Sequence, residues 1–133
     1  MSVSLKRAQA VIDRALTKAG QLGIKVTVAV VDDGGHLIAL SRMDGAMPLS
    51  PQLAEAKAVG AAMFRRDGGA LAKMAQDRPG FFNAADRLVR VPLIPGLGSV
   101  LIAEGGNVVG AVGVSGGRPD QDLECAEAGL SEL

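Results

Sequence analysis

Apolar residues recur every three or four positions over the first 22 residues, and most of the charged side chains between them fall on the opposite face. The apolar positions are Leu5, Ala8, Val11, Ile12, Ala15, Leu16, Ala19 and Leu22. This spacing predicts an amphipathic helix. Ser4 is a suitable N-cap residue, and Gly20 and Gly23 predict where the helix ends.

Two pairs of β-branched, apolar segments predict two hairpins. Residues 25–32 are nearly all apolar, which predicts a strand buried on both faces, and residues 36–42 return as its antiparallel partner after a glycine turn. Residues 99–104 and 108–115 predict the second hairpin. Gly110 and Gly113 lie inside its last strand, where a missing side chain predicts the close approach of a helix, a strand or a ligand.

The remaining segments predict helices and one irregular stretch. Ser50 as N-cap begins an alanine-rich helix to about residue 66, whose small side chains indicate either tight packing on the sheet or a subunit interface. A short helix over 70–76 follows. Proline and glycine make 78–95 irregular, with a short strand near 88–91, and a last helix covers 119–130.

This order of elements predicts the fold class α+β. We expect one domain over residues 1–133, a single-domain α/β sandwich in which helices pack on an antiparallel sheet of about five strands. The pattern is not the alternation of strand and helix that builds a parallel sheet.

Composition excludes several classes of protein. The 14 Lys and Arg balance the 14 Asp and Glu, and three Phe are the only aromatic residues, so the sequence predicts no nucleic-acid partner. No apolar run is long enough to span a membrane, and no secretion signal precedes the first helix, so we expect a cytoplasmic protein without a membrane partner. Cys125, the single cysteine, is interpreted as a small packed residue.

The turn before the last helix is a candidate ligand-binding site. Gly116 and Gly117 can present backbone N–H groups to an anion, and Arg118 adds positive charge. A carboxylate or phosphate would suit these donors, although the same residues also suit an ordinary strand-to-helix turn.

Five side chains could carry acid–base or metal chemistry. His36, the only histidine, could move a proton or bind a metal, and the alternative is a surface or structural histidine. Asp32, Asp44 and Lys57 are the other candidate catalytic residues, with Arg42 as a ligand-binding cation. The alternative for this set is a group of salt bridges at the sheet edge.

Four motifs resemble one protein family, in order and over nearly the whole chain. They are VAVVDDGGHL at 28–37, SRMDGA at 41–46, AEAKA at 54–58 and GAVGVSGG at 110–117, followed by two aspartates. The chain resembles the GlcG-like family, also called the haem-degrading or HbpS-like family. The matching positions are Asp32, Gly35, Arg42, Asp44, Gly45, Lys57, Gly116 and Gly117.

The resemblance implies an α/β sandwich that forms homo-oligomers, from dimers to octamers. It also implies haem as a cofactor or ligand, because some members bind haem and some degrade it, and His36 is the natural nitrogen ligand here. Whether the chain is an enzyme is left open by the resemblance.

Three functions are consistent with these observations. The first is binding of a small, anionic molecule, with haem binding or slow haem degradation as the specific form. The second is acid–base catalysis on a small carboxylate or carbonyl metabolite, with the glycine turn holding the anion. The third is an oligomeric scaffold.

Overall fold

Four antiparallel strands form the sheet at the centre of the fold. They are β1 (Thr27–Asp32), β2 (Leu37–Arg42), β3 (Ser99–Glu104) and β4 (Asn107–Ser115), in the order β2-β1-β4-β3. The structure, a computed structural model, describes residues 1–131. The α+β class is confirmed, but the expected count of about five strands is wrong because the sheet has four.

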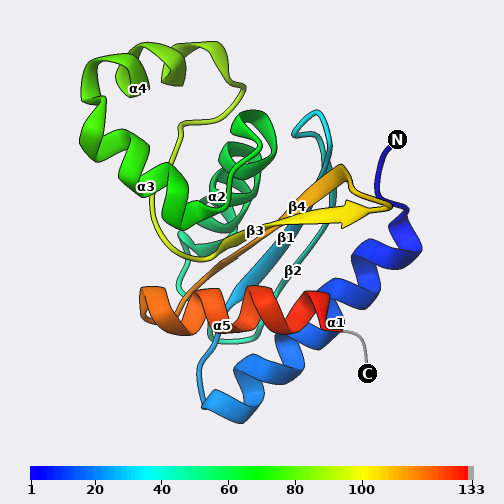
Figure 1. The fold of residues 1–133 in the computed structure, drawn as a ribbon. Helices are drawn as coiled ribbons and strands as arrows, with labels where there is room; N and C mark the ends of the chain where they lie inside the picture. Colours follow the sequence, from blue (N-terminus) through cyan, green and yellow to red (C-terminus); the bar gives the residue numbers. More distant parts are fainter. Residues whose placement is uncertain (132–133) are drawn as a thin grey trace.

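Helices α1 (Leu5–Leu22) and α5 (Pro119–Leu130) cover one face of the sheet (Figure 1). The apolar stripe of α1 packs on this face, as its spacing predicted, and the Ser4 hydroxyl accepts a hydrogen bond from the N–H of Arg7. Gly23, with φ of 71°, ends the helix. Cys125 of α5 is buried in the same core, which confirms its interpretation as a packed residue.

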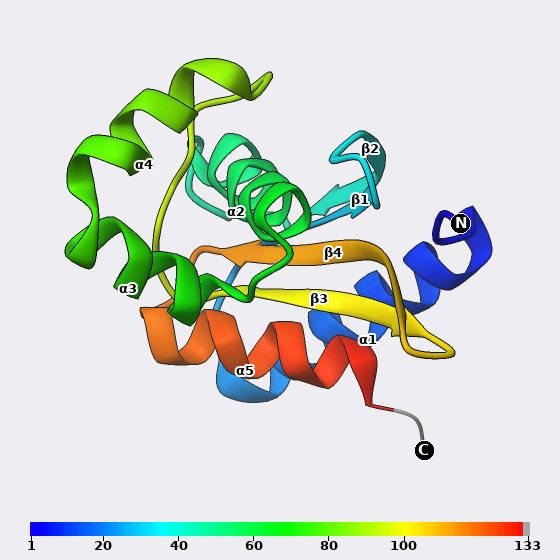
Figure 2. The ribbon, with the colours of Figure 1, turned by 45° about the horizontal axis from the view of Figure 1, so that its top comes forward.

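Helix α2 (Ser50–Phe64) covers the opposite face, with α3 (Gly68–Asp77) and α4 (Pro79–Ala85) beyond it (Figure 2). Its alanines are buried against β1 and β4. A Cβ added to Gly113 would lie 2.8 Å from the backbone nitrogen of Ala58. The close approach predicted at Gly113 is therefore confirmed, and the neighbour is α2.

Three local predictions are wrong. Residues 88–91 form no strand: a 3₁₀ turn covers Asp86–Leu88, and Val91 packs against the α2 core instead of pairing with the sheet. The stretch predicted as irregular contains α4, which begins at Pro79 and buries Phe82. Ser50 is the first residue of α2 and not its N-cap, because its buried hydroxyl bonds to the Thr27 hydroxyl at 2.8 Å.

Within residues 1–131, no helix has both the length and the apolar character that crossing a membrane requires.

Candidate functional site

The β1–β2 turn holds the only histidine in a defined orientation. Asp32 ends β1, and its Oδ1 accepts hydrogen bonds from the backbone N–H groups of Gly34 and His36, both at 2.9 Å. The same oxygen lies 3.2 Å from His36 Nδ1. A carboxylate only accepts hydrogen bonds, so this contact places the proton on Nδ1 and leaves the Nε2 lone pair open. The imidazole is 73% exposed, so Nε2 is accessible.

Two arginines bind the backbone of this turn. Arg65 Nη1 donates to the carbonyl oxygen of Asp33 at 2.6 Å and to that of Ala62 at 2.8 Å. Arg90 donates from Nε and Nη2 to the carbonyl of Gly35, and its Nη2 also lies 2.6 Å from Glu55 Oε2. The turn that carries His36 is therefore fixed to α2 and to the segment after α4.

Arg65 occupies a backbone conformation that usually favours glycine. It follows α2 as its C-cap with φ of 54° and ψ of 43°. Among the described residues it is the only non-glycine with positive φ. A bulky residue in the left-handed region costs roughly 1–2 kcal/mol, and such strain is concentrated at functional positions.

A surface hollow opens beside the turn. Its volume is about 520 Å³, and Asp33, Arg65, Gly106, Asn107 and Val108 lie along it, together with Met1. Both hairpin turns contribute because they lie at the same end of the sheet (Figure 1). The Ser2 hydroxyl donates to Asp33 Oδ1 at 2.7 Å and lowers the pKa of that carboxyl, which is therefore ionised at neutral pH.

Two exposed aliphatic side chains lie near the β1–β2 turn. Met63 packs beside Gly35 and is 48% exposed, and Leu37 is 44% exposed. The three phenylalanines instead pack on one another, with Phe64 and Phe82 stacked at 6.1 Å and Phe81 edge-on to Phe64. The exposed apolar surface at this turn is therefore built from methionine and leucine.

The opposite end of the sheet holds a buried ion pair. Lys57 Nζ lies 3.2 Å from Asp122 Oδ2 and donates to the Val114 carbonyl at 2.9 Å. Asp122 Oδ1 accepts from the N–H of Gly117 at 2.8 Å. Burial raises the pKa of Asp122, in spite of the ammonium beside it. The pair links α2 to α5, which lie on opposite faces of the sheet.

The candidate anion-binding turn is occupied by carboxylates of the chain itself. The N–H of Gly117 bonds to Asp122, and the Arg118 guanidinium bonds to Asp120 with the donors 3.2 and 3.3 Å from the carboxylate oxygens. This exposed ion pair raises the pKa of Arg118 and lowers that of Asp120. Gly116 lies so close to the backbone of Lys25 that a side chain would not fit, because an added Cβ would clash with the Lys25 carbonyl oxygen. A role of these residues toward an external ligand stays a prediction.

The predicted site residues fall into two separate groups. Arg42 pairs with Thr27 at one end of β1, where Arg42 Nη2 donates to the carbonyl of Ala46, and exposed Asp44 follows it. Asp32 and His36 lie at the other end of β1, roughly 16 Å away along five residues of strand. Within one chain, the four candidate catalytic residues therefore do not share a cleft.

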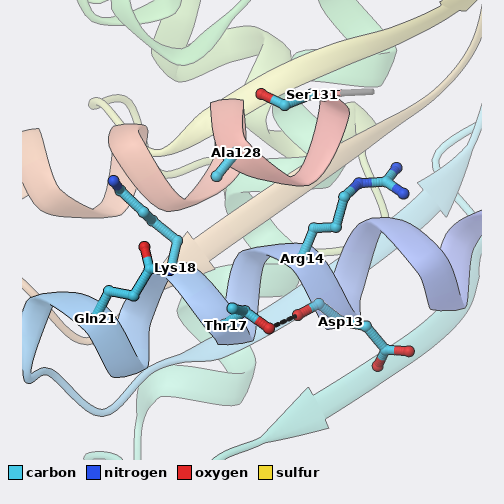
Figure 3. A pocket seen from close by; sticks show the side chains of 7 residues that line it. All are labelled: Asp13, Arg14, Thr17, Lys18, Gln21, Ala128 and Ser131. Atoms are coloured by element: carbon cyan, nitrogen blue, oxygen red, sulfur yellow. Dashed lines mark hydrogen bonds between the residues drawn. The ribbon is translucent and has the colours of Figure 1, made fainter. Parts of the chain in front are cut away.

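A further hollow lies between α1 and α5, and three of its labelled side chains, Arg14, Thr17 and Lys18, already bond to other parts of the chain (Figure 3). Its volume is about 440 Å³. Arg14 Nε donates to the Gly129 carbonyl, Lys18 pairs with Glu124, and the Thr17 hydroxyl donates to the Asp13 carbonyl within its own helix. We therefore place the candidate site at the β1–β2 turn and not in this groove.

Sequence reasoning missed the two arginines of the turn. Arg65 follows the alanine-rich helix, and Arg90 lies in a stretch predicted as irregular, so no periodic pattern connects either of them with His36. It also gave no partner for Lys57, whereas the structure pairs its ammonium with the carboxylate of Asp122. Within the described residues, no group of three or more His, Cys, Asp or Glu could hold a metal ion.

Comparisons with known proteins agree on one family. A family model described as haem degrading protein HbpS-like matches residues 3–131. Protein GlcG of Escherichia coli strain K12 is 37% identical over 114 residues, covering 85% of this chain and 81% of GlcG.

Two solved structures share the fold closely. The crystal structure of a Streptomyces reticuli HbpS double mutant superposes with a TM-score of 0.87 at 28% identity, covering 98% of this chain and 86% of that one. A crystal structure of a PduOC:heme complex also gives 0.87, at 25% identity, over 98% of this chain and 94% of that one. The chain therefore belongs to the HbpS-like family, as its four motifs predicted.

Proposed function

We propose that this protein binds haem at the β1–β2 turn, with His36 Nε2 directed to the iron. The observation that carries the proposal is the contact of His36 Nδ1 with Asp32 Oδ1 at 3.2 Å. This contact favours the tautomer that carries its proton on Nδ1, so Nε2 is free to bind a metal. A carboxylate bonded to Nδ1 of a ligating histidine also raises the basicity of Nε2.

The surroundings of His36 fit a haem lying on the surface of the chain. Met63 and Leu37 offer exposed apolar surface for a porphyrin face, and Arg65 offers positive charge for its carboxylates. Bound haem supplies a redox-active iron. The residues of this chain hold the ligand, orient the imidazole through Asp32 and fix the turn through the two arginines.

The family relationship supports haem as the ligand. One structural neighbour was solved as a complex with haem, and the matching family model is described as haem degrading. Slow haem degradation is the finer part of the proposal. It predicts that the protein accelerates loss of the Soret band of bound haem in air with a reductant, and that His36→Ala abolishes the acceleration.

A haem titration tests the binding proposal. The wild type should shift the Soret band with one haem per chain, and His36→Ala should bind at least ~10-fold more weakly and lose the shift. Asp32→Asn, which retains His36 but weakens its orientation, should lower affinity by roughly tenfold. The absence of a stoichiometric Soret shift, or a shift unchanged in His36→Ala, would refute the proposal. The chain contains no Trp or Tyr, so absorbance of the complex near 280 nm also comes almost entirely from the bound haem.

We also propose that copies of the chain associate. Strands β2 and β3 are the edges of the sheet, and their outer backbone groups have no strand partner within the described residues. Sedimentation equilibrium should therefore give a mass that is a multiple of 13.5 kDa. A 13.5 kDa monomer at micromolar concentration would contradict this part of the proposal.

A further inference from the structure

Arg65 and Arg90 both bind the His36 turn, but their guanidinium groups are engaged to different extents. Arg90 uses Nε and Nη2 on Gly35, and Nη2 also pairs with Glu55. Arg65 uses Nη1 alone. Its Nε and Nη2 have no partner within the part of the chain that the structure describes, and a guanidinium has the geometry to bind a carboxylate through two parallel hydrogen bonds.

The position of Arg65 adds a second, independent observation. Glycine would occupy this left-handed backbone position without strain, yet the chain places its longest cationic side chain there. The same side chain lies along the hollow of about 520 Å³, where Asn107 adds an exposed amide. The hollow therefore combines a partly free guanidinium with amide hydrogen-bonding groups beside the turn of His36.

We infer that Arg65 is the carboxylate-recognition residue of this site, and that it selects porphyrins with free carboxylates over neutral ones. This inference rests on the proposed function. Asp33 lies in the same hollow and is ionised. The N-terminal ammonium of Met1, 3.7 Å from Asp33 Oδ2, offsets part of this charge, and the remainder repels a bound carboxylate that Arg65 attracts. The two side chains together set the affinity for the acid form of the ligand, and Arg90 only holds the turn in place.

The test compares haem with haem dimethyl ester, which carries the same iron and ring without carboxylates. Arg65→Gln should weaken haem binding roughly tenfold more than it weakens ester binding, because the ester loses only the contact of Nη1 with the turn and haem loses a carboxylate partner as well. Asp33→Asn should tighten haem binding by roughly threefold and leave ester binding unchanged. Arg90→Gln should weaken both ligands equally. Arg66→Gln is the matched control, because Arg66 is the exposed neighbour of Arg65 and directs Nη1 to Met74 in α3.

The outcomes separate this inference from the proposed function. If the wild type binds haem and its ester with equal affinity, or if Arg65→Gln weakens both alike, Arg65 is a structural residue of the turn and the inference is wrong while haem binding stands. If the wild type binds neither, both fail. If Arg65→Gln does not fold, Asp33→Asn still tests the inference. A haem affinity of Asp33→Asn equal to that of the wild type would overturn it independently.

Discussion

The buried pair of Lys57 and Asp122 should behave as one unit in a double-mutant cycle. The two side chains are 11% and 4% exposed. Lys57→Met removes the ammonium and leaves a buried carboxylate, which the N–H of Gly117 still contacts. Asp122→Asn keeps the shape and the Gly117 contact, but it leaves a buried ammonium without a counter-charge.

The expected magnitudes follow from burial and from the contacts that survive each change. Each single variant should lose about 3 kcal/mol of unfolding free energy, which is the lower end of the usual cost of breaking a buried ion pair. The cost is at the lower end because one hydrogen bond survives in each variant: Gly117 to residue 122 in Lys57→Met, and Lys57 to the Val114 carbonyl in Asp122→Asn. The double variant leaves no unpaired charge and loses mainly the donor to the Val114 carbonyl. It should therefore be destabilised by about 2–3 kcal/mol, and the coupling energy should be about 3–4 kcal/mol.

Chemical denaturation followed by circular dichroism measures the cycle, and each single variant should melt roughly 10 °C lower than the wild type. The exposed pair of Lys73 and Asp77, at 2.9 Å, is the matched control, and Lys73→Met with Asp77→Asn should give a coupling below about 0.5 kcal/mol. If the two cycles gave equal coupling, burial would not govern the strength of the Lys57 pair, and the reasoning would be refuted.

Four other changes have defined outcomes. Gly113→Ala should lose about 2–3 kcal/mol in the same denaturation assay, because the new methyl group meets the backbone of α2; a loss under 0.5 kcal/mol would contradict that contact. Ser99→Ala should stay within about 1 kcal/mol of the wild type, since its buried hydroxyl has no hydrogen-bond partner in the described chain. Cys125 should resist thiol reagents at pH 8 until the protein unfolds, because burial raises its pKa to about 11; rapid labelling of native protein would count against this. Burial raises the pKa of Asp122 above its unfolded value of 3.8, and Lys57→Met removes the ammonium that opposes this shift, so the stability of Lys57→Met relative to the double variant should fall as pH rises from about 4 through the native pKa.

Local sequence patterns predicted most helices and both hairpins. The last helix was predicted as 119–130 and forms over Pro119–Leu130, because Pro119 and the acidic first turn are signals carried within a few residues. Gly113 was predicted to allow close approach, and only the fold shows that α2 is the neighbour. The strand near 88–91 was wrongly predicted because a short segment with apolar residues around Arg90 is equally suited to packing beneath a helix, and the contact of Val91 with the α2 cluster decides between the two.

The site was predicted only in part, and for a physical reason. Asp32 and His36 are four residues apart, so a turn could bring them together without help from the rest of the chain. Arg65 and Arg90 reach the same turn from 32 and 55 residues away, through contacts between a side chain and a backbone carbonyl. Such contacts produce no repeating pattern of residues from which they could be predicted.

The motifs that identify the family describe mainly the scaffold, and this explains why they predicted the fold better than the function. Lys57 is in the buried ion pair, Gly116 touches backbone, and Arg42 holds the loop after β2. Arg65 and Arg90 lie outside every one of the four motifs. A protein could therefore keep the motifs, and with them the fold, while changing the cations that surround the turn. Ligand selectivity within this fold should accordingly depend on the residue at the end of α2 as well as on Asp33, which lies in the first motif.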